Sequence, residues 1–180
     1  MDHQLLKDLA IKAPGTYHHS LIIGTLAEAA AESISANPLL ARVGAYYHDI
    51  GKMKMPQYFV ENSVEDRHGK LTASMSALVI TSHVKEGVEM AKKHRLGQAI
   101  TDIISQHHGT ALVAFFYQKA RNEVGETEVF EGDFRYNGPK PQTKEAGIVM
   151  LADAIEAASK TLSEHTPDRI QWLTQKIVNK

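Results

Sequence analysis

The spacing of apolar residues is the feature that most limits the possible folds of this chain. Through most of its length these residues recur at three- and four-residue intervals, as at Leu5, Leu6 and Leu9. This interval places them on one face of an α-helix. Weak extended character is confined to Val129-Phe130 and residues 134–136. The sequence therefore predicts an all-α fold, in a single compact helical domain.

Capping residues and helix breakers divide this pattern into helices. Asn37-Pro38 is typical of an N-cap followed by the first helical position, because proline loses no hydrogen bond there. Thr16 is interpreted as another N-cap, and Gly51 as the end of a helix that has His48 and Asp49 in its last turn. The expected helices are a short one before Pro14, then residues 16–36, 37–51, 72–93, 99–107, 111–122 and 143–162, and a last one that opens at Thr166-Pro167.

Two segments interrupt the helical period. Residues 52–70 are expected to form a loop with one helical turn, because proline, asparagine and glycine break the pattern there. Residues 123–142 predict a long connection, which is unusual in a compact domain unless it is functional or mobile. A length of 180 residues fits one domain. We therefore expect a single domain over residues 1–180, with a loop insertion near 123–142.

Composition excludes several classes of protein. The chain has no cysteine, which rules out disulfides, thiolate zinc sites and a cysteine nucleophile. Its formal charge is −1, with no basic stripe, so no DNA or long RNA is expected as a partner. No apolar run approaches the roughly 18 residues of a membrane span, and residues 1–6 do not resemble a signal peptide. A cytoplasmic location is the expectation.

Two aspartates stand out against this background. His48 and Asp49 are adjacent, and adjacent side chains on a helix point in different directions, so the pair can serve two partners. Asp153 lies in an otherwise apolar helical stripe, where a buried carboxylate is costly unless it is paired or binds a metal. The nearest basic residues, Lys144 and Lys160, are too far along the helix to pair with it. A structural ion pair between Asp153 and His19 is the alternative to a metal site.

Histidines complete the candidate site. Five of the ten lie within or at the end of apolar-flanked helical segments, namely His19, His48, His83, His107 and His108. Nitrogen and carboxylate ligands without sulfur suit iron, manganese or zinc rather than calcium or magnesium. Five histidines and two aspartates are too many for one ion. Their number suits two ions that share a carboxylate, an arrangement that clamps a phosphoryl group and generates hydroxide.

The order of these residues resembles the HD superfamily of metal-dependent phosphohydrolases. More specifically, it resembles the cytosolic HD domain of the bacterial seven-transmembrane HD proteins, the PgpH type. The resemblance covers roughly residues 5–180. The segments that carry it are Ala13-Pro14-Gly15-Thr16-Tyr17-His18-His19-Ser20, residues 41–52 ending in His48-Asp49-Ile50-Gly51-Lys52, residues 80–87 around His83, Gln106-His107-His108-Gly109-Thr110, and residues 138–145.

That resemblance implies an enzyme that hydrolyses cyclic di-AMP to pApA with two divalent transition-metal ions, iron or manganese first and zinc as an alternative. One ion would take His19, His48, Asp49 and Asp153. The other would take Asp49 as the bridge, together with His83, His107 and His108.

Asp49 is the candidate catalytic residue, as the bridge between the two ions. Lys52 is the candidate for contact with the phosphate and for a catalytic role. Arg135, Tyr136 and Lys140 in the long loop are candidates for contact with a base or a second phosphate. Full-length members of the family also carry an extracellular region and transmembrane helices. The chain would therefore meet a membrane only as part of a larger protein, and homo-oligomerisation is left open.

Other functions compete with this prediction. A relative could act on cyclic di-GMP, a nucleoside monophosphate or an alarmone. The chain has no Gly-Tyr-Pro after the metal ligands, which argues against the cyclic di-GMP branch. A regulatory module that only binds a ligand or partner is the alternative from another class. Such modules usually lose metal ligands, and here all seven positions are filled.

Overall fold

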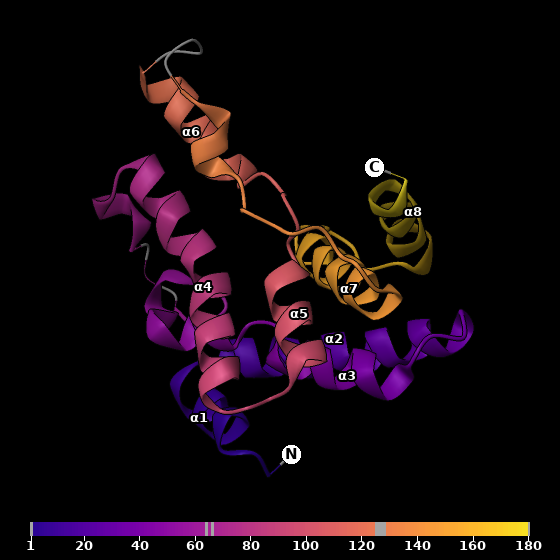
Figure 1. The fold of residues 1–180 in the computed structure, drawn as a ribbon. Coiled ribbons are helices and arrows are strands. Elements are labelled where there is room, and N and C mark those ends of the chain that lie inside the picture. Colours follow the sequence, from indigo (N-terminus) through magenta and orange to yellow (C-terminus); the bar gives the residue numbers. More distant parts are fainter. Residues whose placement is uncertain (1, 64, 66, 125–128, 180) are drawn as a thin grey trace.

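The structure, a computed structural model, describes residues 2–63, 65, 67–124 and 129–179. Within them the chain forms helices joined by short 3-10 turns, and the one β-pairing described is an isolated bridge between Leu112 and Arg135 (Figure 1). The α-helices are α1 (Gln4–Lys12), α2 (Pro14–Ser33), α3 (Pro38–Tyr47), α4 (Ala73–Lys93), α5 (Gln98–Gln106), α6 (Ala114–Val124), α7 (Lys144–Ser159) and α8 (Pro167–Val178). The predicted all-α fold is confirmed.

Most helices begin where the sequence predicts. The side chain of Asn37 accepts a hydrogen bond of 3.0 Å from the backbone of Leu40, and Pro38 takes the first position of α3. Thr72, Thr143 and Thr166 cap α4, α7 and α8 in the same way. These side chains satisfy backbone N–H groups that have no partner within the helix.

Thr16 is not an N-cap. Helix α2 begins two residues earlier, at Pro14, and Thr16 is buried inside its first turn. Its hydroxyl instead donates a hydrogen bond to the carboxylate of Glu61. The prediction was wrong because a proline at the first helical position starts the helix without a side-chain cap.

The end of α3 also differs from the prediction. The α-helix stops at Tyr47, His48 is its C-cap, and Asp49 precedes the 3-10 helix η1 (Ile50–Lys54). Gly51 lies so close to α4 that a Cβ atom there would be 1.8 Å from the carbonyl oxygen of His83. This close approach pulls the chain out of the α3 axis, so His48 and Asp49 leave from a turn and not from a helix.

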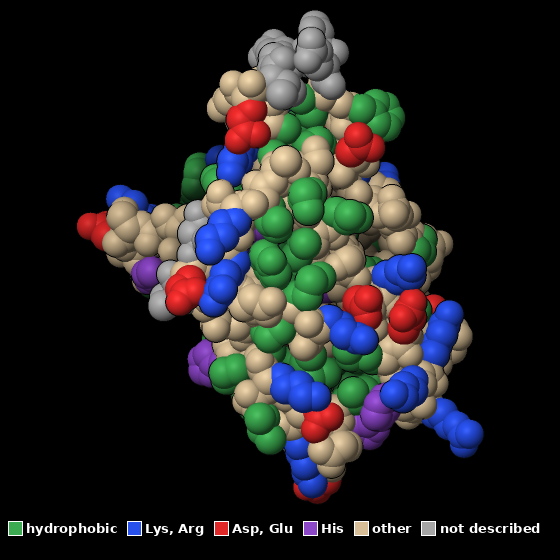
Figure 2. Space-filling model, turned by 90° about the vertical axis from the view of Figure 1, so that its left-hand side faces the viewer, with side chains coloured by type: hydrophobic (Ala, Val, Ile, Leu, Met, Phe, Trp, Pro, Cys, Tyr) green, Lys and Arg blue, Asp and Glu red, His purple; other side chains and the backbone are tan. Residues whose placement is uncertain are grey.

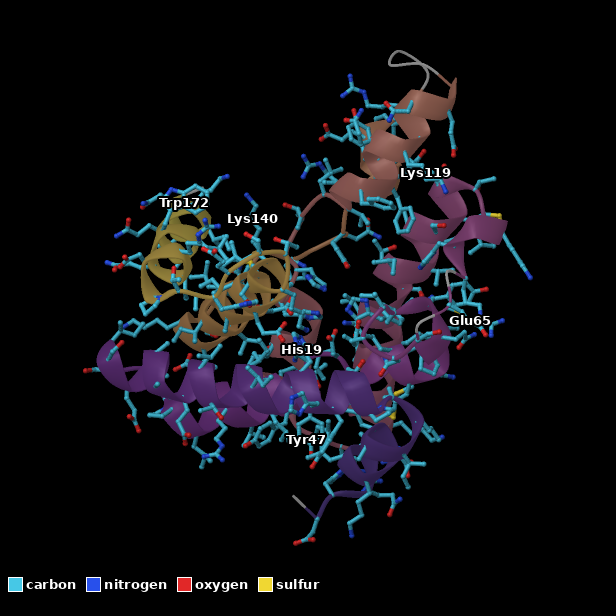
Figure 3. All side chains as sticks on the ribbon, turned by 180° about the vertical axis from the view of Figure 1, so that it is seen from behind. His19, Tyr47, Glu65, Lys119, Lys140 and Trp172 are labelled. Atoms are coloured by element: carbon cyan, nitrogen blue, oxygen red, sulfur yellow. The ribbon has the colours of Figure 1, made fainter. Side chains whose placement is uncertain are left out.

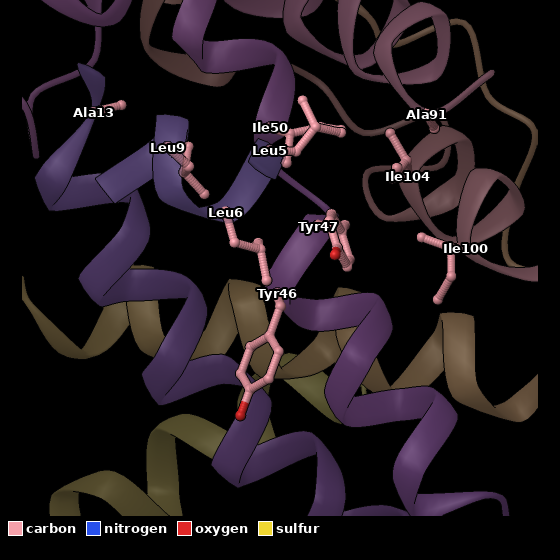
Figure 4. Packing of buried hydrophobic residues seen from close by; sticks show 10 residues of the cluster. All are labelled: Leu5, Leu6, Leu9, Ala13, Tyr46, Tyr47, Ile50, Ala91, Ile100 and Ile104. Carbon is pink, nitrogen blue, oxygen red and sulfur yellow. The ribbon is translucent and has the colours of Figure 1, made fainter. Parts of the chain in front are cut away.

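A hydrophobic core holds the amino-terminal helices together. Leu5, Leu6 and Leu9 of α1 pack with Tyr46 and Tyr47 and with residues of η1, α4 and α5 (Figure 4). The two tyrosines are therefore core residues. A second cluster joins α2, α3, α5 and α7. These helices enclose the middle of the molecule, whereas α6 projects away from them with the far end of α4 (Figure 1).

The predicted loops have local structure. Residues 52–70 contain the end of η1 and two further 3-10 helices, η2 (Pro56–Tyr58) and η3 (His68–Lys70). In the predicted connection 123–142, helix η4 (Glu131–Phe134) buries Phe134 against α4 and α6. Residues 125–128 of this connection lie outside the described residues. The single domain over residues 1–180 stays a prediction.

The outer surface of α4 is partly apolar. Met75 and Leu78 are exposed on it, and Figure 2 shows hydrophobic side chains gathered in the middle of this face, with lysines and arginines around them. Among the described helices, none combines the length and hydrophobicity needed to cross a membrane.

Candidate metal centre

Seven residues from distant parts of the sequence meet between the helices. His19 comes from the second turn of α2 and lies near the centre of the molecule, whereas Trp172 on α8 lies at its edge (Figure 3). The other six come from the end of α3, from α4, from the end of α5 and from α7. They are His48, Asp49, His83, His107, His108 and Asp153.

Asp49 lies between two groups of these ligand atoms. Its Oδ2 atom is 3.2 Å from Nε2 of His48 and 3.8 Å from Nε2 of His19. Its Oδ1 atom is 3.1 Å from Nε2 of His83 and 3.6 Å from Nε2 of His107. The two carboxylate oxygens therefore face different sets of imidazoles, which is the arrangement a bridging ligand requires.

Asp153 and His108 complete the two groups. Asp153 Oδ1 is 3.0 Å from Nε2 of His19 and 3.9 Å from Nε2 of His48. Ligand atoms of His108, His83, His107 and Asp49 all lie within 4.8 Å of one another. The contact between His19 and Asp153 that the alternative requires is thus present, but it is part of a larger cluster.

The orientation of the imidazoles suits metal ions. Nδ1 of His48, His83 and His107 each donates a hydrogen bond to a backbone carbonyl three residues earlier, over 2.6, 2.6 and 2.7 Å. These bonds turn the Nε2 atoms toward the cluster. Among the described residues, Nε2 of His48 and Oδ1 of Asp49 are buried without a hydrogen bond, and Oδ2 of Asp49 is buried with the ammonium group of Lys52 at 2.6 Å. Burying a polar atom without a hydrogen-bond partner is costly, so such atoms fit a site that binds cations.

Burial and neighbouring charges shift the pKa values of the residues in the cluster. Burial lowers the pKa of His48, but the adjacent carboxylate of Asp49 outweighs it and raises this pKa to about 9. Burial raises the pKa of Asp49, but Lys52 and His48 outweigh it and hold this pKa well below its usual range. Burial lowers the pKa of His107 and of His108, the latter strongly. His107 and His108 therefore present neutral imidazoles at neutral pH, as metal ligands must be.

Lys52 lies beside the bridging carboxylate. Its ammonium group is 2.6 Å from Oδ2 of Asp49 and 2.9 Å from Oε1 of Glu61, and its side chain is only 13% exposed. Glu61 also accepts the hydroxyl of Thr16. Sequence reasoning missed Glu61, because nothing in the charged segment 52–70 distinguishes it from a solvated loop residue.

Glu156 is a second residue that sequence reasoning missed. It lies three positions after Asp153 on α7, and its Oε2 atom is 3.0 Å from Nδ1 of His19. The signal was present, since a residue three positions from Asp153 shares its helix face. Sequence reasoning treated Asp153 as the one carboxylate of that stripe.

Two cavities border the cluster. One, of about 640 Å³, is lined by α4, by His108 and Gly109 and by Tyr136, whose ring stacks on that of His108 at 4.2 Å. The other, of about 680 Å³, is lined by His19, Lys52, Asp153 and other residues of α2 and α7. Both volumes are typical of sites for small ligands.

The structure brings two of the four predicted substrate contacts to these cavities. Lys52 and Tyr136 line them. Arg135 is not among their lining residues, and its guanidinium donates to the carbonyl of Thr110 and pairs with Glu131. Lys140 is exposed and likewise outside both linings. Its label in Figure 3 lies beside α7. The roles of all four in substrate binding stay predictions.

The chain is similar in sequence to known proteins that contain an HD domain. The HD domain family matches residues 16–158. A Bacillus subtilis (strain 168) protein named cyclic-di-AMP phosphodiesterase PgpH is 47% identical over 180 residues, which cover 99% of this chain and 25% of that protein. The protein of the same name from Listeria monocytogenes serotype 1/2a (strain 10403S) is 48% identical over 179 residues, with 98% and 25% covered.

A solved structure is also similar. The crystal structure of the L. monocytogenes phosphodiesterase PgpH HD domain in complex with cyclic-di-AMP has a TM-score of 0.94 and 48% sequence identity, and the match covers 98% of this chain and 82% of that chain. This chain spans about a quarter of the length of the curated relatives it matches.

Proposed function

The chain belongs to the HD domain family, and on this premise we propose that it is a metal-dependent phosphodiesterase that hydrolyses cyclic di-AMP to the linear dinucleotide pApA. Relatives at 47% and 48% identity carry the name of that activity. The observation that carries the proposal is the position of Asp49, whose two buried oxygens face two separate groups of histidines. All seven ligand positions are filled, which favours an enzyme over a regulatory module.

Two divalent transition-metal ions are the proposed cofactors. His19, His48, Asp49 and Asp153 would hold one, and Asp49, His83, His107 and His108 would hold the other. Iron or manganese suits this ligand set, with zinc as the alternative. When bound, such a pair neutralises phosphoryl charge and supplies a hydroxide nucleophile at neutral pH.

The chain's own residues would position the substrate. Lys52 places a buried cation next to Asp49, where it can attract a phosphate that enters the cavity of about 680 Å³. Tyr136 presents an aromatic ring to the other cavity, beside His108, and rings of this kind stack on nucleobases. A cavity on each side of the cluster would let one dinucleotide place its phosphate at the centre and its bases to the sides.

The cellular context is proposed from the same relatives. The chain covers a quarter of their length, so we propose that it works as the catalytic domain of a larger protein. The cytoplasmic location and the state of oligomerisation stay predictions.

Hydrolysis of a small panel of nucleotides tests the proposal. The chain would be loaded with manganese and offered cyclic di-AMP, cyclic di-GMP, linear pApA, a nucleoside monophosphate and an alarmone, with products separated by chromatography. We expect cyclic di-AMP to be converted to pApA faster than any other compound is cleaved. Cleavage of another member with cyclic di-AMP untouched would make the proposed substrate wrong.

A further inference from the structure

Glu156 is a buried carboxylate next to the metal centre that the proposed ligand set does not use. It is 7% exposed and lies one helical turn after Asp153 on α7. Its Oε2 atom is 3.0 Å from Nδ1 of His19, and its Oε1 atom is 2.8 Å from the ammonium group of Lys160. Burying a carboxylate costs solvation free energy, which its contacts with charged or hydrogen-bonding partners must offset.

His19 differs from its neighbours in this contact. Nδ1 of His48, His83 and His107 meets a neutral backbone carbonyl in each case. Nδ1 of His19 meets the carboxylate of Glu156, while Nε2 of the same ring is 3.0 Å from Asp153. Two carboxylates from one face of α7 therefore hold the two nitrogens of one imidazole.

Glu156 is placed to act through His19 and not on the ion itself. The two ring nitrogens of an imidazole point in different directions, so a carboxylate on Nδ1 lies on the far side of the ring from an ion held by Nε2. A carboxylate in that position fixes the ring, keeps the proton on Nδ1 and makes Nε2 a better donor to the metal. A hydrogen bond to an ionised acceptor does this more strongly than one to a carbonyl.

We propose that Glu156 is a positioning residue that sets the affinity of one of the two metal ions, the one held by His19, His48, Asp49 and Asp153. The inference rests on the proposed metal centre and adds an asymmetry to it, because Nδ1 of His83 and Nδ1 of His107, both of the other group, face backbone carbonyls and not carboxylates. Lys160 holds Glu156 from outside, but its side chain is 54% exposed and contributes little.

Glu156→Gln tests the proposal, because it keeps the size of the side chain and removes its charge. Manganese binding would be followed by titration and by electron paramagnetic resonance, without any nucleotide. We expect the affinity of one ion to fall by about 10–100-fold, while that of the other is unchanged. At limiting manganese the variant should hold one ion per chain, with the spectrum of His48→Ala, which lacks a ligand of the same ion.

Glu164→Gln is the matched control, since Glu164 is an exposed carboxylate on the connection between α7 and α8. It should bind both ions as the unaltered chain does. A residue that only packs would change the melting temperature and leave both affinities equal to those of the control. If Glu156→Gln does not fold, Glu156→Asp shifts the carboxylate and serves in the same comparison.

The outcomes separate this inference from the proposed function. Wild-type affinity for both ions in the Glu156 variant, or an equal loss of both, overturns the role of Glu156 and leaves the hydrolysis of cyclic di-AMP untouched. A selective loss of one ion in a chain that cleaves no nucleotide supports Glu156 and overturns the proposed activity.

Discussion

At the scale of single residues, His48 links metal binding to pH. The carboxylate of Asp49 raises the pKa of His48 to about 9, so its imidazole is protonated at neutral pH before metal binds. A metal ion can bind only the neutral imidazole and must displace that proton. The raised pKa also means that His48 stabilises the metal-free fold at low pH, and that this contribution is lost as the pH rises toward 9.

Metal affinity should therefore increase with pH. Because His48 must lose one proton, we expect the affinity of its ion to rise about tenfold per pH unit between about pH 7 and 8.5, and to level off near 9. Calorimetric titration with manganese in buffers of different ionisation enthalpy would measure both the affinity and the released proton. Affinity that is independent of pH, with no proton released, would contradict this account of His48.

Lys52 is the residue whose loss should affect turnover without removing the metals. Lys52→Met takes away the cation beside Asp49 and Glu61 but leaves all seven ligands in place. We expect kcat for cyclic di-AMP to fall by about 10²-fold, in line with the loss of one charge-stabilising donor. Metal content should stay at that of the unaltered chain.

Lys54→Met is the control for this substitution, because Lys54 is two residues away and 57% exposed. It should leave kcat unchanged. Equal rates for the two variants would remove Lys52 from the list of residues that act on the substrate.

At the scale of elements, the packing of η1 against α4 positions the bridging carboxylate. Gly51 allows the close approach, since a Cβ atom there would lie 1.8 Å from the backbone of His83 and 2.6 Å from that of Gly87. Neither backbone atom can move without shifting α4. The contact therefore holds Asp49 and His83 at a fixed separation.

Gly51→Ala should destabilise the fold by about 1–3 kcal/mol, because the added methyl group overpacks this contact. Urea unfolding monitored by circular dichroism would measure the change. Gly147→Ala in α7 is the matched control, since its Cβ atom would meet only Pro141 at 3.9 Å. Alanine is the better helix former, so this control should be stabilised by about 0.5–1 kcal/mol. Similar changes in the two variants would contradict the role of Gly51.

The same contact shows what the sequence could and could not predict about elements. Asn37, Thr72, Thr143 and Thr166 marked helix starts correctly, because an N-cap is a local interaction. The end of α3 was predicted four residues too late. It depends on how Gly51 packs against His83 and Gly87 of α4, which are more than thirty positions away in sequence, and helical period alone does not contain that information.

The candidate site, too, could be predicted from the sequence only in part. The seven ligand positions could be proposed from residue types and a family resemblance, and the structure brings all seven together. Glu61 and Glu156 could not be assigned partners, because their roles depend on which side chains of α2 and η1 they meet. Arg135 looked available in the sequence but is paired with Glu131.

At the scale of the whole molecule, the proposed ions would connect segments that are far apart in sequence. Ligands come from α2, α4, α7 and the ends of α3 and α5. A ligand that binds only the folded state stabilises it in proportion to the logarithm of its concentration. Loss of the ions should therefore loosen contacts between these helices.

Removal of metal should lower the melting temperature. We expect a chain stripped with a chelator to melt several degrees below the manganese-loaded chain, and manganese to restore the difference in a concentration-dependent way. Differential scanning calorimetry would measure it. Calcium at the same concentration serves as the control, because it prefers oxygen ligands and should have little effect. Identical melting curves with and without manganese would contradict the predicted stabilisation.

The number of ions bound by the chain and by Asp49→Ala tests the central claim most directly. The chain would be stripped, reloaded with manganese and freed of excess metal before elemental analysis. We predict about two ions per chain for the unaltered protein and a loss of both in Asp49→Ala, because this carboxylate faces both groups of histidines. No bound metal in the unaltered chain, or two ions retained by Asp49→Ala, would contradict the claim that Asp49 bridges a two-metal centre.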